Sequence, residues 1–279
     1  MKKLRVLAGA LASAVPALAL AGYDVNIPAP KTPISLQIYG LHMEIMYVCL
    51  AIFVVVFGVM FYSLFAHRKS RGAVAAHFHE NTTVEVIWTL IPFLILAVIA
   101  FPATKTVLAM KDASNPDMTI KVTAYQWKWQ YDYLNDGLKL YATLSTPREQ
   151  IGAPDAHGKV TNEHYLLETD NNVVVPVGKK IRLLITANDV IHGWYVPQLG
   201  VNQYGIPGFI KDAWFQANEP GVYRGQCSQI CGKEHGYMPI VVEAKSAEDY
   251  AAWVKEQKAK QAADAAPAEK VSLADPVVR

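Results

Sequence analysis

Two long apolar segments constrain what this chain can fold into more than any other feature. They cover residues 38–66 and 84–110. Each is longer than the roughly 20 residues that an α-helix needs to cross a bilayer. Pro92 and Pro102 interrupt the second segment, but transmembrane helices tolerate proline where neighbouring groups take up the freed carbonyls. We therefore expect a hairpin of two transmembrane helices.

Residues 1–21 have the features of a secretory signal peptide. Basic residues open the chain, an apolar run covers 6–20, and Ala19-Leu20-Ala21 offers a cleavage site with small residues. The alternative is a retained membrane helix. It is disfavoured because Pro16 interrupts a run that is already short for spanning. We expect cleavage before Gly22.

The loop between the two apolar segments predicts their orientation. Residues 67–71 read His-Arg-Lys-Ser-Arg, and basic loops of this kind stay in the cytoplasm. A cleaved signal independently places residues 22–37 outside, so both arguments give the same topology. The formal net charge is +2 and no dense basic patch is present, which excludes nucleic-acid binding. We expect a multi-pass protein of the bacterial inner membrane, with 67–83 cytoplasmic and everything after Met110 extracytoplasmic.

Residues 111–250 have the pattern of an all-β domain. Short runs of β-branched and apolar residues alternate there with Gly, Pro, Asn and Asp, and such spacing predicts a sandwich or barrel. Residues 251–279 are rich in Ala, Lys, Glu and Gln, and predict a short helix followed by a flexible end. The runs expected as strands include 119–125, 165–169, 172–176 and 180–187.

The stretch from Gly225 to Pro239 holds the residues best suited to chemistry. Its candidate ligands are Cys227, Cys231, His235 and Met238. Thiolates and thioethers are soft ligands and imidazole suits copper, so this set favours copper over Mg²⁺ or Ca²⁺. The glycines and the proline of the stretch favour a loop folded around an ion over one face of a helix.

Three other interpretations compete for the same loop. A Cys227–Cys231 disulfide is a common outcome in an oxidising compartment, but it gives His235 and Met238 no role. A zinc site has little use for a thioether. A mononuclear blue-copper site needs one cysteine, not two. The third cysteine, Cys49, lies in the first apolar segment and is expected to be buried or to face lipid.

A second imidazole is available from His192, which follows the expected strand 180–187 and precedes Cys227 by 35 residues. Two thiolates, two imidazoles and a thioether form a coherent set if the cysteines bridge two copper ions. Bridging sulfurs let one unpaired electron spread over both metals, so little around them must move on reduction. That arrangement suits electron transfer and not substrate chemistry.

The pattern His192-x-Trp194, then Cys227-Ser228-x-x-Cys231-Gly232-x-x-His235-x-x-Met238-Pro239, resembles the CuA signature of cytochrome c oxidase subunit II. The resemblance covers the chain after the signal, including the helix hairpin. It implies a cupredoxin-like Greek-key barrel that holds two copper ions. Cys227 and Cys231 would bridge them, His192 and His235 would be terminal ligands, and Met238 and the Gln229 backbone carbonyl would be weak ligands.

Two further residues gain a role through this resemblance. Residues 126–133 are similar to the family's aromatic segment over the copper centre, where Trp127 matches the residue that receives electrons from cytochrome c. Glu85 matches a carboxylate at the mouth of a proton path, at the start of the second span. Without the resemblance, the aromatic residues would be barrel packing, and Glu85 would be an ordinary residue of the membrane boundary.

Two departures from the family pattern matter. Gln229 stands where the family usually has Glu, whose side chain helps to hold a Mg²⁺ ion at the border with subunit I, so that ion is in doubt. Residues 112–250 contain 16 acidic and 12 basic residues, a net charge of −4. This weak acidic bias indicates a donor that is less basic than usual, or one that is tethered.

The resemblance implies the electron-transfer subunit of a proton-pumping terminal oxidase. Its partners would be subunit I, subunit III and a cytochrome c or similar c-type donor. Oxygen reduction would occur in subunit I, because the two helices offer no haem-ligand pattern. A quinol oxidase subunit II would lack the copper ligands, and a membrane-tethered copper carrier or assembly protein would not need Trp127 or Glu85. Nitrous oxide reductase carries a large additional domain, and the lack of Cys-x-x-Cys-His excludes a fused c-type haem.

Overall fold

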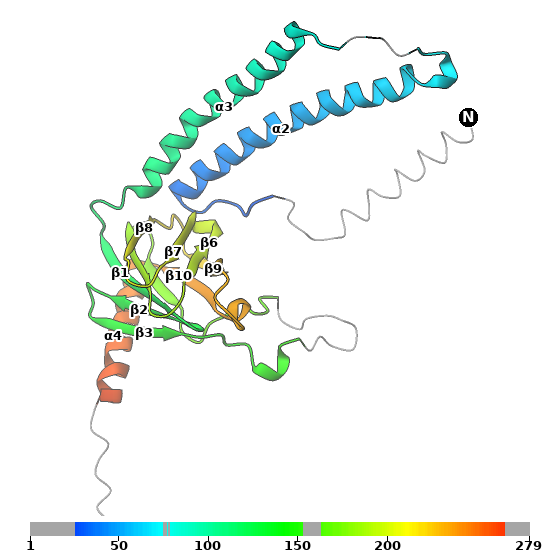
Figure 1. The fold of residues 1–279 in the computed structure, drawn as a ribbon. Coiled ribbons are helices and arrows are strands. Elements are labelled where there is room, and N and C mark those ends of the chain that lie inside the picture. Colours follow the sequence, from blue (N-terminus) through cyan, green and yellow to red (C-terminus); the bar gives the residue numbers. More distant parts are fainter. Residues whose placement is uncertain (1–25, 75–76, 78, 153–162, 266–279) are drawn as a thin grey trace, which may run out of the picture.

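The computed structural model describes residues 26–74, 77, 79–152 and 163–265. The expected signal peptide, residues 1–21, lies outside these ranges. Figure 1 shows two parts, a long helical hairpin and a β-domain followed by a helix. The hairpin consists of α2 (Pro33–Ala66) and α3 (Thr82–Lys111), with the short 3-10 helix η1 (Lys69–Arg71) between them.

Both hairpin helices begin at polar capping residues. At the start of α2, the Thr32 hydroxyl accepts a hydrogen bond from the Ser35 amide, and the Ser35 hydroxyl accepts one from the Thr32 amide. Asn81 caps α3 by accepting from the Val84 amide at 3.2 Å. Both helices are long and apolar enough to cross a membrane, and α3 continues through its two prolines.

The apolar side chains of the hairpin face outward. Phe93 and Leu94 of α3 are exposed, as are most large apolar side chains of α2. Cys49 is a free, exposed thiol on α2. An apolar surface of this extent is stable only in contact with lipid or with other membrane helices.

Within the described residues, ten strands form two sheets of five. The first has the order β3-β2-β1-β5-β8 and the second β4-β10-β9-β6-β7. In each sheet one pair is parallel (β1 with β5, and β4 with β10) and the other pairs are antiparallel. Their bounds are β1 (Met118–Tyr125), β2 (Lys128–Tyr133), β3 (Leu138–Ala142), β4 (Val173–Pro176), β5 (Ile181–Ala187), β6 (His192–Val196), β7 (Val201–Gly205), β8 (Lys211–Phe215), β9 (Gly221–Cys227) and β10 (Pro239–Lys245).

The core lies between the sheets. Alternate residues of β5 are buried, as period-2 burial requires. Tyr133 joins the sheets, because its hydroxyl donates to the Val174 carbonyl and accepts from the Val174 amide. The all-β, cupredoxin-like barrel behind a two-helix hairpin is thus confirmed. One expected strand is wrong: residues 165–169 form a turn with a single bridge at Thr169, because Leu166 adopts a left-handed φ of 61°.

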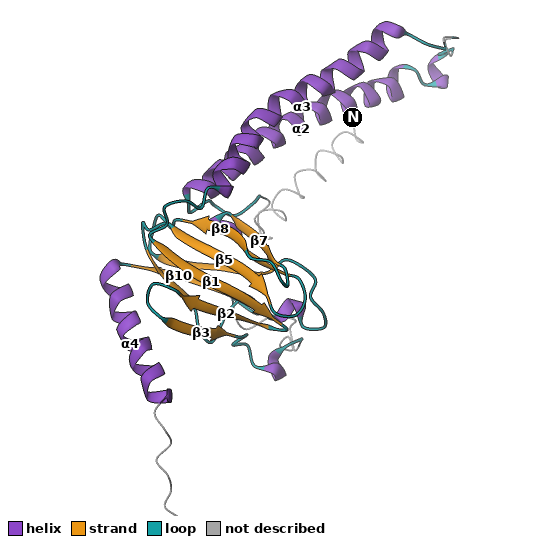
Figure 2. Ribbon diagram, turned by 60° about the vertical axis from the view of Figure 1, so that its left-hand side comes forward, coloured by secondary structure: helices purple, strands orange, loops and turns teal. Residues whose placement is uncertain are grey.

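The hairpin is fixed to one end of the barrel. The Thr32 hydroxyl donates to the Leu199 carbonyl at 2.9 Å, within the 3-10 helix η3 (Pro197–Leu199). The Trp214 indole donates to the Ala109 carbonyl of α3 at 3.0 Å. Figure 2 shows the hairpin leaving the β-domain on one side and α4 (Ala247–Ala265) lying on another.

Candidate metal centre

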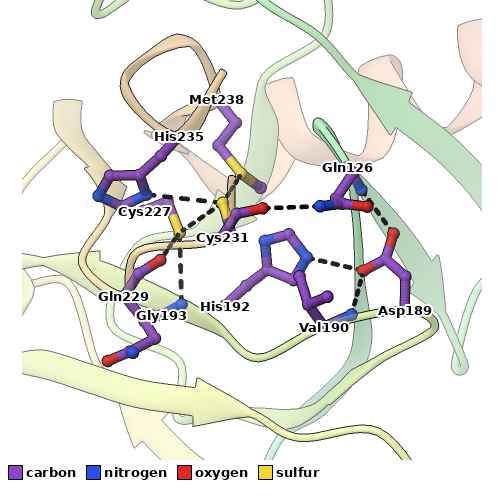
Figure 3. A network of polar contacts seen from close by, with 10 residues as sticks. All are labelled: Gln126, Asp189, Val190, His192, Gly193, Cys227, Gln229, Cys231, His235 and Met238. Atoms are coloured by element: carbon purple, nitrogen blue, oxygen red, sulfur yellow. Dashed lines mark hydrogen bonds and ion pairs between the residues drawn. The ribbon is translucent and has the colours of Figure 1, made fainter. Parts of the chain in front are cut away.

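The loop between β9 and β10 places the four predicted sulfur and imidazole ligands at one end of the barrel. β9 ends at Cys227 and β10 begins at Pro239, and the 3-10 helix η4 (His235–Tyr237) lies between them. His192 is the first residue of β6, and two residues later Trp194 pairs with Cys227. Strand pairing therefore brings the distant His192 to the loop, as Figure 3 shows.

His192, Cys227 and Cys231 form a buried cluster. One ligand atom from each lies within 4.8 Å of the others. The two Sγ atoms are 3.9 Å apart, whereas a disulfide requires about 2.0 Å. Both cysteines are free thiols in this arrangement. The separation allows both sulfurs to bind the same ion, because two metal–thiolate bonds of about 2.3 Å can span it.

The remaining predicted ligands surround the same two sulfurs. Met238 Sδ and His235 Nδ1 each lie 3.5 Å from Cys231 Sγ. The backbone carbonyl of Gln229 lies 3.2 Å from Cys227 Sγ. Met238 is buried at 1% exposure, so its thioether is available to the site and closed to solvent.

The imidazole of His192 is oriented from outside the cluster. Its Nε2 donates to Asp189 Oδ1 at 2.8 Å. The same carboxylate also accepts a hydrogen bond from the backbone amide of Gln126 at 2.7 Å. Its other nitrogen, Nδ1, is buried and has no hydrogen-bond partner among the described residues. A carboxylate that fixes one ring nitrogen and leaves the other bare is the usual arrangement around a metal-binding histidine. The orphaned nitrogen, which would otherwise be costly to bury, fits a metal ligand.

The two thiols differ in acidity. Burial favours the neutral form, but at Cys227 the nearby His192 and the Gly193 amide outweigh it and lower the pKa. At Cys231, burial and the adjacent Cys227 thiolate raise the pKa to about 12. The pocket therefore accepts one negative charge easily and resists a second. A bound cation would offset the second charge, so this donor set fits a thiolate-bound metal.

Hydrogen bonds hold the loop against its neighbours. The Ser228 amide donates to the Gly193 carbonyl at 3.0 Å, and its hydroxyl donates to Asn202 at 2.9 Å. A Cβ at Gly193 would clash with the Ser228 hydroxyl, so that position has no room for a side chain. The Gln126 side chain donates to the Cys231 carbonyl at 2.8 Å. The ligands thus lie on a loop fixed at several points.

Trp127 lies against this loop. A Cβ at Gly232, whose φ is 117°, would come within 3.2 Å of the Trp127 ring. The indole nitrogen is buried and lacks a hydrogen-bond partner in the described structure. Trp129, by contrast, is fully buried, packs edge-on against His192 and donates to the Met238 carbonyl. Of the two tryptophans, Trp127 is the one with a partly exposed side chain.

Glu85 is not part of this cluster. It lies in the first turn of α3, and one carboxylate oxygen is 3.4 Å from the Asn81 amide, which donates to it. In Figure 1 this end of α3 is far from the barrel. A negative side chain is stabilised at a helix N-terminus whatever else it does.

Sequence reasoning missed Asp189 and Gln126. Asp189 precedes His192 by three residues, and a short acidic residue in a turn beside a candidate histidine was a usable signal. The role of Gln126 had no such signal, because its contact with the Cys231 carbonyl joins residues that are 105 positions apart.

Comparison with known proteins agrees with this geometry. The family described as "Cytochrome C oxidase subunit II, periplasmic domain" matches residues 118–245, and the corresponding transmembrane domain matches 21–106. Cytochrome c oxidase subunit 2 of Cyanidium caldarium is 37% identical over 238 residues, covering 84% of this chain and 90% of that protein. The probable cytochrome c oxidase subunit 2 of Rickettsia prowazekii is 36% identical over 234 residues, covering 83% and 72%.

One solved structure adds to the comparison. The periplasmic domain of subunit II of the cytochrome oxidase of Bradyrhizobium japonicum is 36% identical, with a TM-score of 0.46. The alignment covers 53% of this chain and 98% of that one.

Proposed function

The chain belongs to the cytochrome c oxidase subunit II family, and on that premise we propose that its metal loop holds two copper ions as a binuclear CuA centre. As a member it is the electron-transfer subunit of a haem-copper oxidase complex, which is an oxidoreductase. The chain itself is a membrane protein with an extracytoplasmic domain. In the proposal, Cys227 and Cys231 bridge the metals. His192 and His235 are terminal ligands, and Met238 and the Gln229 carbonyl bind weakly.

One observation carries the proposal. Four donor atoms surround a sulfur pair 3.9 Å apart, and one of them, His192 Nδ1, is buried without a hydrogen-bond partner among the described residues. A disulfide would leave that nitrogen unsatisfied. A zinc site would not need the buried thioether of Met238. Soft sulfur with imidazole favours copper.

The residues of this chain would keep the site rigid and dry. Bound copper would supply a one-electron carrier whose charge is shared between two nuclei. The buried cysteines exclude water, and the hydrogen bonds from Gln126 and Ser228 hold the loop in one shape. Because little of this framework has to move, electron transfer through the site needs little reorganisation.

Trp127 would be the entry point for electrons from a cytochrome c or a similar c-type donor. Its ring lies against Gly232, the residue after the proposed bridging ligand Cys231. The side chain is partly exposed, so it can contact a donor on one side and the metal loop on the other.

Subunit I would pack on the loops around the metal. Ile230 lies between two proposed ligands and is 81% exposed, and Phe209 and Ile210 are 62% and 59% exposed. The latter two lie in the loop after β7, whose Gly205 pairs with His192. Exposed apolar side chains beside a metal loop favour a protein partner. The Mg²⁺ ion of this border is not part of the proposal, because Gln229 offers an amide in place of a carboxylate.

The whole assembly would lie in the bacterial inner membrane, with subunits I and III beside the hairpin. Protons for oxygen reduction would enter from the cytoplasmic side, where Glu85 lies in the first turn of α3. The exposed apolar faces of α2 and α3 support neighbours within the bilayer.

Metal analysis and EPR of the fragment that begins at residue 112 would test the copper assignment. We expect two coppers per chain and a mixed-valence signal in which one electron couples equally to both nuclei. Cys227→Ser should abolish that signal, whereas Met238→Leu should keep a binuclear site with an altered potential, because an axial thioether tunes potential more than it retains metal.

Cys49→Ser, tested in the full-length chain, is the matched cysteine control. This thiol lies on α2 and should affect neither copper content nor signal. One copper per chain in reconstituted protein, or zinc alone, would refute the binuclear centre.

A further inference from the structure

A polar groove of about 520 Å³ lies beside Trp127. One wall is the segment 143–148, which carries the hydroxyls of Thr143, Ser145 and Thr146. Glu234 and Tyr237 of the metal loop line the groove as well. The groove therefore lies between Trp127, the proposed electron-entry residue, and the segment 143–148, which has no role in the proposed function.

Among the described residues that line the groove, the two charged side chains, Arg148 and Glu234, neutralise each other. Arg148 donates from Nη1 to Glu234 Oε1 at 2.9 Å and from Nη2 to Oε2 at 2.6 Å, a two-pronged pair. The Arg148 side chain is 67% exposed and that of Glu234 is 20% exposed. Ion pairs this exposed add little to the free energy of unfolding. The main effect of the pair is therefore to cancel charge in the groove.

The segment that carries Arg148 is fastened at its other end too. The backbone amide and hydroxyl of Thr143 donate to Asp170 at 2.6 and 2.8 Å. Arg224 of β9 donates to Glu168, which precedes Asp170 by two residues. These contacts can hold the wall without Arg148, so removing one member of the Arg148–Glu234 pair changes the charge of the groove more than its shape.

We propose that the Arg148–Glu234 pair is a specificity-determining element that keeps the groove beside Trp127 electrically neutral. Docking in the groove then depends on hydroxyl groups and the Trp127 ring. The neutral groove selects c-type donors whose contact surface carries little charge. The inference rests on the proposed function. The domain's modest net charge of −4 over residues 112–250 agrees with a donor that is not steered by strong attraction.

Substitutions that expose one charge at a time would test the inference on the purified oxidase complex. The probe is a strongly basic soluble c-type cytochrome, with KM and kcat read from oxygen consumption at low salt. Arg148→Gln leaves Glu234 unpaired and should lower KM about two- to fivefold, whereas Glu234→Gln leaves Arg148 unpaired and should raise KM by a similar factor. The double variant should return to the wild-type KM, and high salt should remove the differences.

Arg182→Gln is the matched control. It breaks a comparably exposed ion pair with Asp212, between β5 and β8, which does not line the groove. Its KM should equal that of the wild type. The optical spectrum and copper content of every variant should be unchanged.

Four outcomes would overturn the inference. A shift of KM in the same direction in both single variants would make the pair merely structural, and so would a double variant that is not restored. Loss of copper in Glu234→Gln would mean that the pair serves the metal loop. If the wild-type complex takes no electrons from any c-type cytochrome, the proposed function itself fails and the inference falls with it.

Discussion

At the scale of single residues, positions outside the proposed ligand set shape the candidate metal centre. Gly232 adopts a φ of 117°, which side-chain-bearing residues rarely do, and a Cβ there would lie only 3.2 Å from the Trp127 ring. Asp189 accepts a hydrogen bond from Nε2 of His192 and leaves Nδ1 free to face the sulfurs of Cys227 and Cys231. Each of these residues sets the geometry of a neighbour that does the chemistry.

Trp127→Phe tests whether the indole carries electrons or only packs. The smaller ring can still lie against Gly232, so copper content and spectrum should be unchanged. Electron entry from a c-type donor should slow by about tenfold or more, because the larger indole and its partly exposed edge are lost. Stopped-flow reduction of the metal centre by the donor measures the rate.

Trp129→Phe provides the comparison, since that ring is fully buried and donates to the Met238 carbonyl. It should change the properties of the site more than the rate of donor encounter. A wild-type rate in Trp127→Phe would leave the ring a packing role.

The proposed ligands could be grouped from sequence because they are clustered. Cys227, Cys231, His235 and Met238 lie within twelve consecutive residues, and their spacing alone indicates a metal loop. The contacts of Gln126 and Asp189 depend on how β1, β2 and the loop before β6 come together in three dimensions. No local pattern encodes that approach, so these supporting residues emerge only from the structure.

At the scale of elements, α4 shows how the C-terminal segment is attached to the barrel. The Tyr250 hydroxyl donates to Asp136 at 2.6 Å, and the Trp253 ring packs on Tyr133 with centroids 5.4 Å apart. Alanine- and lysine-rich composition predicts a helix, but the helix already begins at Ala247, where Glu248 and Asp249 occupy its first turn. Its docking depends on a few aromatic residues.

Trp253→Ala should therefore loosen α4 without disturbing the metal loop. The ring is half-buried, so about half of the roughly 3–5 kcal/mol typical of a buried aromatic truncation is expected, about 2 kcal/mol. Urea unfolding of the fragment that begins at residue 112 measures the free energy of unfolding.

Trp253→Phe should recover most of that stability, because a ring remains to pack on Tyr133. An unchanged midpoint in Trp253→Ala would show that α4 contributes nothing to the folding unit of the barrel.

Strand prediction was accurate where alternation was regular and failed where the backbone left the extended region. The run 180–187 overlaps β5 with alternate residues buried, as its sequence pattern predicts. The run 165–169 has a similar composition, yet Leu166 turns left-handed there. Composition alone does not distinguish a strand from a turn that contains apolar residues.

At the scale of the whole molecule, the hairpin would separate the proposed electron-transfer site from the proposed proton-entry residue. The metal loop and Trp127 lie in the barrel, and the contacts of Thr32 and Trp214 fix that barrel to the extracytoplasmic ends of the helices. Glu85 lies at the opposite end of α3, the end that follows the loop with Arg68, Lys69 and Arg71. Electron entry and proton entry would then occur on opposite sides of the membrane.

Glu85→Ala tests this division in the assembled oxidase. If the carboxylate collects protons at the cytoplasmic boundary, copper content and electron entry should stay near normal. Steady-state oxygen consumption per assembled complex should fall severalfold at a proton-dependent step. Glu85→Asp should recover part of the rate, because a carboxylate remains, although its side chain is one methylene shorter.

The hydrogen bond from the Asn81 amide gives Glu85 an alternative, structural role, and a further variant distinguishes the two roles. If Glu85 only supports the start of α3 through the Asn81 amide, Glu85→Gln should keep that hydrogen bond and restore wild-type behaviour. A proton-collecting Glu85 predicts the opposite, since an amide cannot take up a proton at neutral pH. Normal turnover per assembled complex in Glu85→Ala would remove the residue from the proton path and leave the copper assignment unaffected, because the two sites share no residue.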